Sequence, residues 1–190
     1  PLLRDRLLVV LAGLPRPDAN QAILDCIARS DKAGLCPPAA AIRAAGLRKI
    51  AAAAPAVRKV LDQAAAEKAG LLVRQVHAAI LAADELGLPV RRDANNICEK
   101  LWSHQPGFRL MLTDAARLLG RQADLPQGDE QNVPTRDQCI RTLRSAVVYD
   151  FRPTTWPATQ PRPKAVRTPL PSAAAAVALW MLNSPACEEY

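Results

Sequence analysis

Two short sequence markers recur along this chain at a nearly constant spacing. The tetrapeptide Lys-Ala-Gly-Leu occupies Lys32–Leu35 and returns at Lys68–Leu71, about 36 residues later. A leucine-proline pair that follows glycine or aspartate lies at Gly13–Pro15, Gly87–Pro89 and Asp124–Pro126, with separations of about 74 and 37 residues. Such a period is typical of solenoids, in which each unit buries its apolar face by stacking on its neighbours. The spacing therefore predicts a stack of units with an extended binding surface.

The composition favours helices over sheets. Of the 190 residues, 49% are hydrophobic but only 4% are aromatic, and alanine supplies much of the apolar content. Alanine favours close helix packing, whereas sheets are rich in branched and aromatic residues. The most apolar run, Ala173–Leu182, is shorter than the roughly 18 residues that a membrane span needs, so no transmembrane segment is predicted. The net charge of +7 permits RNA, an acidic protein or an anionic membrane surface as a partner.

Turn signals divide residues 1–150 into an antiparallel series of helices. Glycine suits the end of a helix and proline its first turn, so these residues set most of the predicted boundaries. The predicted helices are Leu2–Leu11, a helix capped by Asp18 or Asn20 that ends near Lys32, a helix from Pro37 or Pro38 to about Ala54, Ala56–Lys68, Leu72–Leu86, Ala94–His104 after a start at Asp93, Phe108–Arg121, and a helix from Pro134 to about Val148. The sequence thus predicts an all-α domain of helical-hairpin repeats over residues 1–150.

Residues 151–190 differ from the rest of the chain because they are rich in proline. Proline excludes regular helix and favours extended backbone, so we expect an extended tail with a short apolar helix at Ala173–Asn183. Large apolar side chains in a segment that cannot build its own core are expected to contact another protein or the repeat domain. The residues predicted to bind a partner are Arg152, Trp156, Arg162, Lys164, Arg167, Trp180 and Met181.

The cysteines and histidines do not form a recognisable catalytic or metal-binding pattern. The five cysteines, Cys26, Cys36, Cys98, Cys139 and Cys187, contain no C-x-x-C pair, so reduced thiols are expected. His77 and His104 are too few for a zinc site without closely spaced cysteines. Cys98 and His104 lie on different faces of one predicted helix, which makes a nucleophile-base pair a poor interpretation. We therefore predict no catalytic, cofactor-binding or metal-binding residues and no cofactor.

The repeated markers resemble the pentatricopeptide-repeat family over about residues 2–148. Units of that family end in a glycine-leucine-x-proline-aspartate motif, which Gly13–Asp18 matches with one extra residue. The turns Asp31–Gly34 and Glu67–Gly70 are similar to the lysine-x-glycine turn between the two helices of a unit, and Ala83–Leu88 is similar to the end of the second helix. The resemblance implies a solenoid of antiparallel helical hairpins similar to tetratricopeptide repeats.

The resemblance implies one of two functions. Most members bind single-stranded RNA through polar residues near the fifth position of the first helix, but counting on from Asp18 and Asp93 gives Ile23 and Cys98, which are poor base readers. A smaller branch acts as structural subunits of mitochondrial assemblies, including the F1 head of ATP synthase. The expected function is therefore a non-catalytic, protein-binding subunit on the matrix side of mitochondria, with the F1 alpha subunit of ATP synthase as a possible partner. An RNA-binding protein or a mitoribosomal subunit is the alternative.

Overall fold

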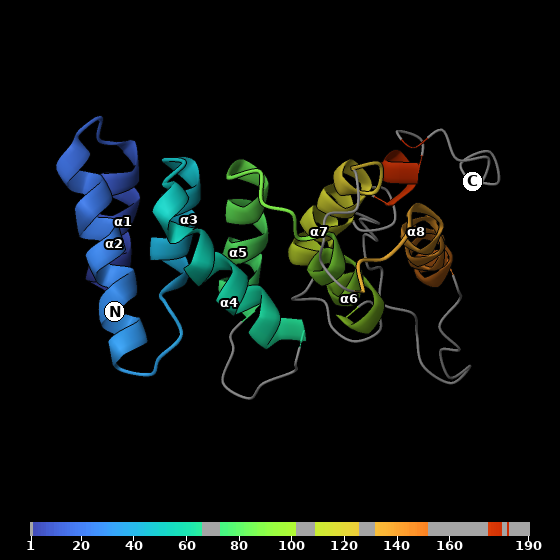
Figure 1. Cartoon of the computed structure of the whole chain (residues 1–190), viewed down its shortest axis with the longest axis horizontal. Helices are drawn as coiled ribbons and strands as arrows, with labels where there is room; N and C mark the ends of the chain where they lie inside the picture. The colour runs from blue at the N-terminus through green and yellow to red at the C-terminus, as the bar shows by residue number, and fades with distance from the viewer. Residues whose placement is uncertain are drawn as a thin grey trace, which may run out of the picture.

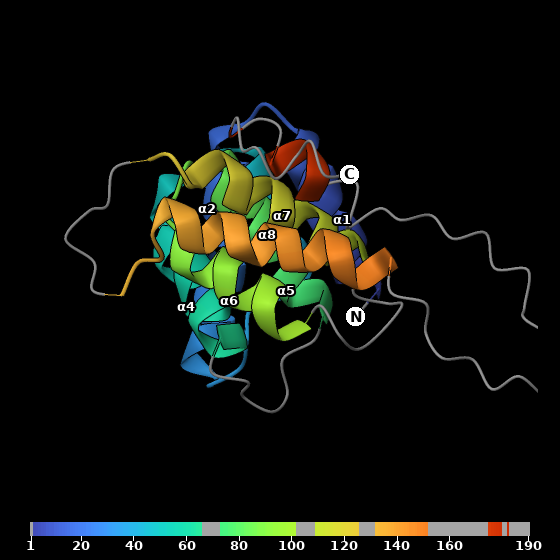
Figure 2. The same ribbon diagram turned by 90° about the vertical axis from the view of Figure 1, so that its right-hand side faces the viewer.

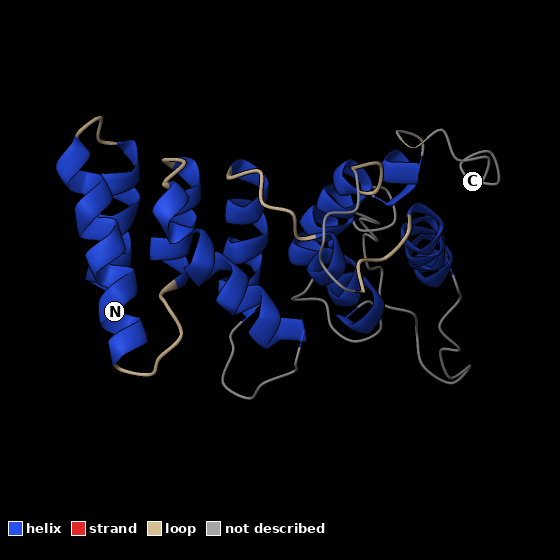
Figure 3. Ribbon diagram, in the orientation of Figure 1, coloured by secondary structure: helices blue, strands red, loops and turns tan. Residues whose placement is uncertain are grey.

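The computed structural model describes residues 2–65, 73–101, 109–125, 132–151, 175–179 and 182. Every regular element in these residues is helical, and none of them belongs to a strand (Figure 3). The principal helices are α1 (Leu2–Gly13), α2 (Pro17–Lys32), α3 (Ala39–Leu47), α4 (Ala54–Ala65), α5 (Val73–Glu85), α6 (Arg91–Leu101), α7 (Arg109–Gln122) and α8 (Arg136–Phe151), and a short 3-10 helix precedes α4 at Ala51–Ala53. The predicted all-α class is confirmed for this part of the chain.

The helices pack in two layers (Figure 1). In one layer α3 lies between α1 and α5, and α7 packs on the other side of α5. In the second layer α6 lies between α4 and α8. Each helix of the second layer also packs against the next helix along the chain, as α2 does with α3, α4 with α5 and α6 with α7. The core lies between the two layers and contains many alanines, which let the helix axes approach closely.

Left-handed residues end three of these helices. Gly34 follows α2 and Gly87 follows α5, with φ angles of 66° and 63°, as predicted for glycine after a helix. Lys49, with a φ of 52°, does the same after α3. The amide of Ile50 donates to the carbonyl of Ala45, which closes the helix end. The prediction of one continuous helix to about Ala54 is therefore wrong, because Lys49 breaks it.

Several helix starts also differ from the sequence prediction. Helix α6 begins at Arg91, so Asp93, the predicted start, lies inside its first turn. Helix α2 begins at Pro17, and no side chain caps it. Asp18 therefore lies inside the first turn, where its carboxylate interacts favourably with the positive end of the helix dipole. Helix α8 begins at Arg136 instead of Pro134. Thr135 Oγ1 accepts a hydrogen bond from the amide of Gln138 at 3.3 Å, and Gln138 Oε1 accepts one from the amide of Thr135 at 2.7 Å. This reciprocal capping box fixes the start of the helix.

Close backbone approach occurs at two glycines, Gly46 and Gly120. A Cβ added to Gly46 on α3 would lie 2.6 Å from the Cα of Ala82 on α5. A Cβ added to Gly120 on α7 would lie 2.5 Å from the Cβ of Ala178. Gly46 and Gly120 are about 74 residues apart, which is also the separation of the first two leucine-proline markers.

Residues 175–179 and Leu182, which we call the C-terminal cap, pack back onto the helical domain. The cap lies beside α7 and α8 in the view of Figure 2. Ala175, Ala178 and Leu179 are buried, and the carbonyl of Leu182 accepts a hydrogen bond from Arg136. Ala178 occupies the same place against Gly120 that Ala82 occupies against Gly46. The described part of the predicted terminal helix therefore covers α7 as a further helix of the first layer would.

Candidate protein-docking surface

The residues that the sequence predicts to bind a partner are not part of the described structure. Arg152, Trp156, Arg162, Lys164, Arg167, Trp180 and Met181 all lie outside it, and so does His104. The described helices carry paired arginine and aspartate side chains on their surfaces. None of these side chains was among the residues predicted to bind a partner. A docking surface must therefore be sought on the helical domain.

Arg48 fastens the turn between α1 and α2. Its guanidinium donates hydrogen bonds to the carbonyl oxygens of Leu11, Leu14 and Arg16, at 3.3 Å for Leu11 and 2.9 Å for Arg16, and also to Oδ1 of Asn20. Arg48 follows α3, so this single side chain ties the end of α3 to α1, to α2 and to the turn between them. The carbonyl of Leu14 precedes Pro15 in the leucine-proline marker, and the marker thus lies at a contact between units.

The leucine carbonyl also accepts a side-chain hydrogen bond at the other two leucine-proline markers. Gln122 stands about 74 residues after Arg48 and bonds to the carbonyl of Leu88 at 2.6 Å and the amide of Val90 at 2.9 Å. Arg91, which is buried, donates to the carbonyl of Leu125. At each marker the leucine carbonyl therefore accepts a hydrogen bond from a side chain 34 residues away in the sequence. The sequence spacing revealed the markers, but not the residues that bond to them.

Many surface charges pair between successive helices of one layer. Asp84 on α5 pairs with Arg121 on α7 at 2.6 Å, and His77 pairs with Asp114 at 2.8 Å. Further ion pairs join α2 with α4, α3 with α5 and α4 with α6 through Asp31–Lys59, Arg43–Glu85 and Asp62–Arg92. These carboxylates neutralise cations that a nucleic-acid surface would use for phosphate groups. His77 is half-buried beside Asp114.

The cysteines of α6 and α8, Cys98 and Cys139, are buried and their thiols are unreactive. Burial raises the pKa of the Cys98 thiol far above its ordinary value, with a smaller contribution from the charge of Glu99. Burial also raises the pKa of Cys139 to about 11. Both thiols are therefore protonated near neutral pH, and protonated thiols are weak nucleophiles. In the described part of the chain, no group of three or more acidic, histidine or cysteine side chains is arranged to hold a metal ion.

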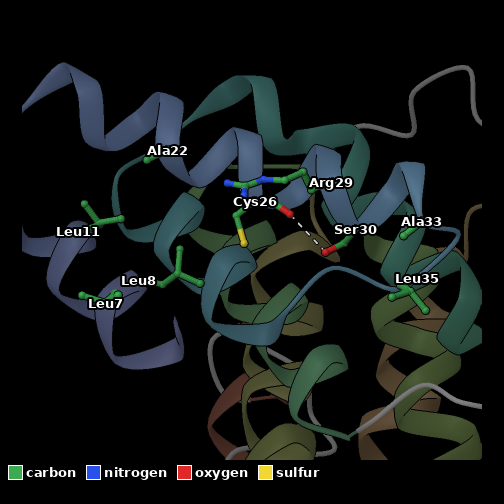
Figure 4. Close-up of a pocket in the computed structure, with 9 residues that line it drawn as sticks. All are labelled: Leu7, Leu8, Leu11, Ala22, Cys26, Arg29, Ser30, Ala33 and Leu35. Atoms are coloured by element: carbon green, nitrogen blue, oxygen red, sulfur yellow. Dashed lines mark hydrogen bonds between the residues drawn. The ribbon is translucent and has the colours of Figure 1, made fainter. Parts of the chain in front are cut away.

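An apolar groove of about 420 Å³ lies between α1 and α2 (Figure 4). We call it the end groove. Helix α1 contributes leucines, and α2 with its following turn contributes small side chains, one thiol and one cation. The lining residues are Leu7, Leu8, Leu11, Ala22, Cys26, Arg29, Ser30, Ala33 and Leu35.

The end groove faces away from the rest of the stack. Asn20 and Asp31 of α2 bond to Arg48, which follows α3, and to Lys59 on α4, respectively. At 3.6 residues per turn, Ala22, Cys26 and Arg29 lie on roughly the opposite side of the helix. All nine residues that line the groove come from α1, α2 and the turn after α2, which lie at one end of the molecule in Figure 1.

Large apolar side chains are exposed around this end. Leu7 and Leu35 line the end groove and are 54% and 64% exposed, and Val10, on the same helix as Leu7, is 58% exposed. Isolated exposed leucines are common, but several together beside a groove mark an interaction surface. The C-terminal cap covers α7 at the other end of the same layer. The open groove and its apolar rim are therefore the candidate protein-docking surface.

The base-reading positions counted from the sequence lie in the core. Ile23 is 0% exposed and Cys98 is 2% exposed, so neither side chain is positioned to contact a nucleotide. Among the described helices, none combines the length and the apolar character that crossing a membrane requires.

Comparisons of the chain with protein-family models, with curated proteins and with solved structures find no match.

Proposed function

We propose that this chain is a non-catalytic helical-repeat subunit that binds other proteins within a larger assembly. The observation that carries the proposal is the end groove, whose rim exposes Leu7 and Leu35. Burying apolar surface there would contribute about 25 cal/mol per Å², which favours a protein partner. The repeat spacing and the two-layer packing support a solenoid of antiparallel hairpins, which offers such surfaces at its ends and along its length.

The resemblance to structural pentatricopeptide-repeat subunits makes a mitochondrial assembly the first candidate. Within mitochondria, the F1 head of ATP synthase and its alpha subunit are the specific partners to test. The proposal places the chain on the matrix side. The Pro-rich residues 151–190 are proposed as a second attachment, through Trp156, Trp180 and their basic neighbours.

Affinity purification of the tagged full chain from its own cells tests the proposal. The expected result is a stoichiometric set of co-purified proteins that survives nuclease treatment and moderate salt. The assembly is then identified by mass spectrometry, and ATP synthase subunits would support the specific candidate. Recovery of the chain with a defined RNA, lost on nuclease treatment and steeply weakened by salt, would contradict protein binding and favour the RNA-binding alternative.

A further inference from the structure

We propose that the end groove binds an amphipathic α-helix of the partner, which packs on α1 beside α2 as α2 packs on α3 and pairs with α4 through Asp31 and Lys59. This inference rests on the proposed function, because it names the segment that the open end would bind. The internal repeat supplies the argument. A shift of about 37 residues carries α1 onto α3 and α2 onto α4, so the interior shows what the end groove would hold.

The α1 side of the groove corresponds to positions that are occupied farther along the chain. Leu8 corresponds to Ala45, and both side chains are buried in the core. Leu11 corresponds to Arg48, which bonds to Asn20 of α2. The surface that α3 offers to its neighbours is thus filled partly by α2. The matching surface of α1 lines the end groove, where Leu7 is exposed.

The α2 side gives the same correspondence independently. Ala22 lines the end groove, and its counterpart about 37 residues later is Lys59 on α4. Lys59 forms an ion pair with Asp31 at the end of α2. The position of Ala22 is therefore the position at which an earlier helix touches α4. The correspondence between Ala22 and Lys59 therefore indicates that the end groove binds a helix that runs beside α2.

The buried face of α2 indicates the side chains that the partner helix needs. Ala19, Ile23 and Ile27 are buried at intervals of four residues, a spacing that keeps them on one face of the helix. We therefore infer a helix with one small and two aliphatic side chains at that spacing. Leu7 and Leu35 at the rim would contact its flanks.

Arg29 adds a charge requirement that the other lining residues do not. Arg29 is the only one of the nine groove-lining residues that carries a permanent positive charge. Its Nε donates a hydrogen bond to the carbonyl oxygen of Asp25 at 3.2 Å. A guanidinium at the edge of an apolar groove favours a carboxylate on the incoming helix. The inferred partner segment is therefore an amphipathic helix with an acidic residue beside its apolar stripe.

An extended form of the full chain tests this seat without knowledge of the natural partner. A copy of residues 17–37 is fused directly ahead of Pro1. In the natural chain residues 17–37 directly precede Pro38, which lies about 37 residues after Pro1, so the fusion keeps the repeat spacing. The two cysteines in the copy are changed to serine. In the host, Cys36→Ser and Cys187→Ser leave Cys26 in the groove as the reporter thiol.

The measurement is the rate at which N-ethylmaleimide alkylates Cys26. Linkage gives the copied helix a high effective concentration, so we expect alkylation to slow by about tenfold. The matched control carries Ile23→Ser and Ile27→Ser in the copied helix only, and it should react as fast as the chain without an extension. Equal rates for the two extended variants, with equal helix content by circular dichroism, would overturn the inferred seat.

A second comparison tests the charge requirement. The copied helix carries aspartates, so Arg29→Gln in the host should weaken the protection of Cys26 about two- to threefold at low salt. Unchanged protection would show that the carboxylate is not required. Failure of the seat is distinguishable from failure of the proposed function: if partners co-purify but the copied helix gives no protection, the end groove binds something other than a helix of this kind.

Discussion

Individual residues in this chain act mainly at the contacts between helices. Gly46 permits close approach of α3 and α5, and Arg48 bonds to three carbonyl groups and one side chain of the preceding hairpin. Gly46 and Arg48 are close in the sequence, and both contact residues that are distant in the sequence. The stability of the stack therefore depends on a few residues at the unit boundaries as well as on the apolar core.

Gly46→Ala should destabilise the whole domain. The added Cβ would lie 2.6 Å from the backbone of Ala82, so helices must move apart. Overpacking costs about 1–3 kcal/mol and the gain in helix propensity returns up to about 1, which leaves a net loss of roughly 1–2 kcal/mol. Urea unfolding followed by circular dichroism measures the change. Gly13→Ala is the control, because nothing lies within 4 Å of its added Cβ, and equal losses in the two variants would contradict the packing argument.

Arg48→Met should also lower the free energy of unfolding. Methionine keeps much of the apolar stem but cannot bond to the carbonyls of Leu14 and Arg16. Because the site is partly solvent-exposed, we expect a loss of about 2 kcal/mol, measured by urea unfolding. Arg117→Met removes an exposed ion pair and should cost under about 0.5 kcal/mol. A cost for Arg48→Met as small as the control would show that Arg48 does not fasten the first hairpin.

Whole elements were predictable where the local signal is strong. Gly34 and Gly87 end helices as predicted, because glycine adopts positive φ without strain. The end of α3 was missed because Lys49 carries no such signal, and Lys49 adopts positive φ through the hydrogen bonds of the helix end. The Thr135–Gln138 capping box is visible in the sequence, but the proline before it suggested an earlier start.

The docking surface was less predictable than the helices. Sequence reasoning placed partner binding in residues 151–190, where exposed aromatic side chains were expected. It could not identify the end groove, because Leu7 and Leu35 look like ordinary core leucines until the packing of α1 and α2 shows which faces stay uncovered. The close approach at Gly46 was also beyond sequence reasoning, since it depends on where Ala82 lies in space.

The C-terminal cap should respond to Gly120→Ala differently from the rest of the chain. The new Cβ would meet Ala178 at 2.5 Å, which displaces residues 175–179. Helix α7 itself gains about 1 kcal/mol of helix propensity, so the midpoint of global unfolding should change little. Hydrogen exchange with mass spectrometry should show faster exchange in the cap by about tenfold or more. If exchange in the cap is unchanged, Ala178 does not depend on contact with Gly120.

At the scale of the molecule, the two ends of the stack differ. One end of the first layer is covered by the C-terminal cap, whereas the other presents the end groove and its apolar rim. The end groove exposes Leu7 and Leu35, and exposed apolar side chains gathered at a groove are where we expect another protein to bind.

The most direct test of this account compares Leu7→Glu with Leu125→Glu in the tagged full chain. The two leucines are 54% and 50% exposed, so both variants should fold with similar stability, which circular dichroism checks. A charge in the end groove should reduce the co-purified partner by about tenfold or more, while the same charge at Leu125 should leave it within about twofold. Equal recovery of partner proteins with both variants would contradict the claim that the open end is the docking surface.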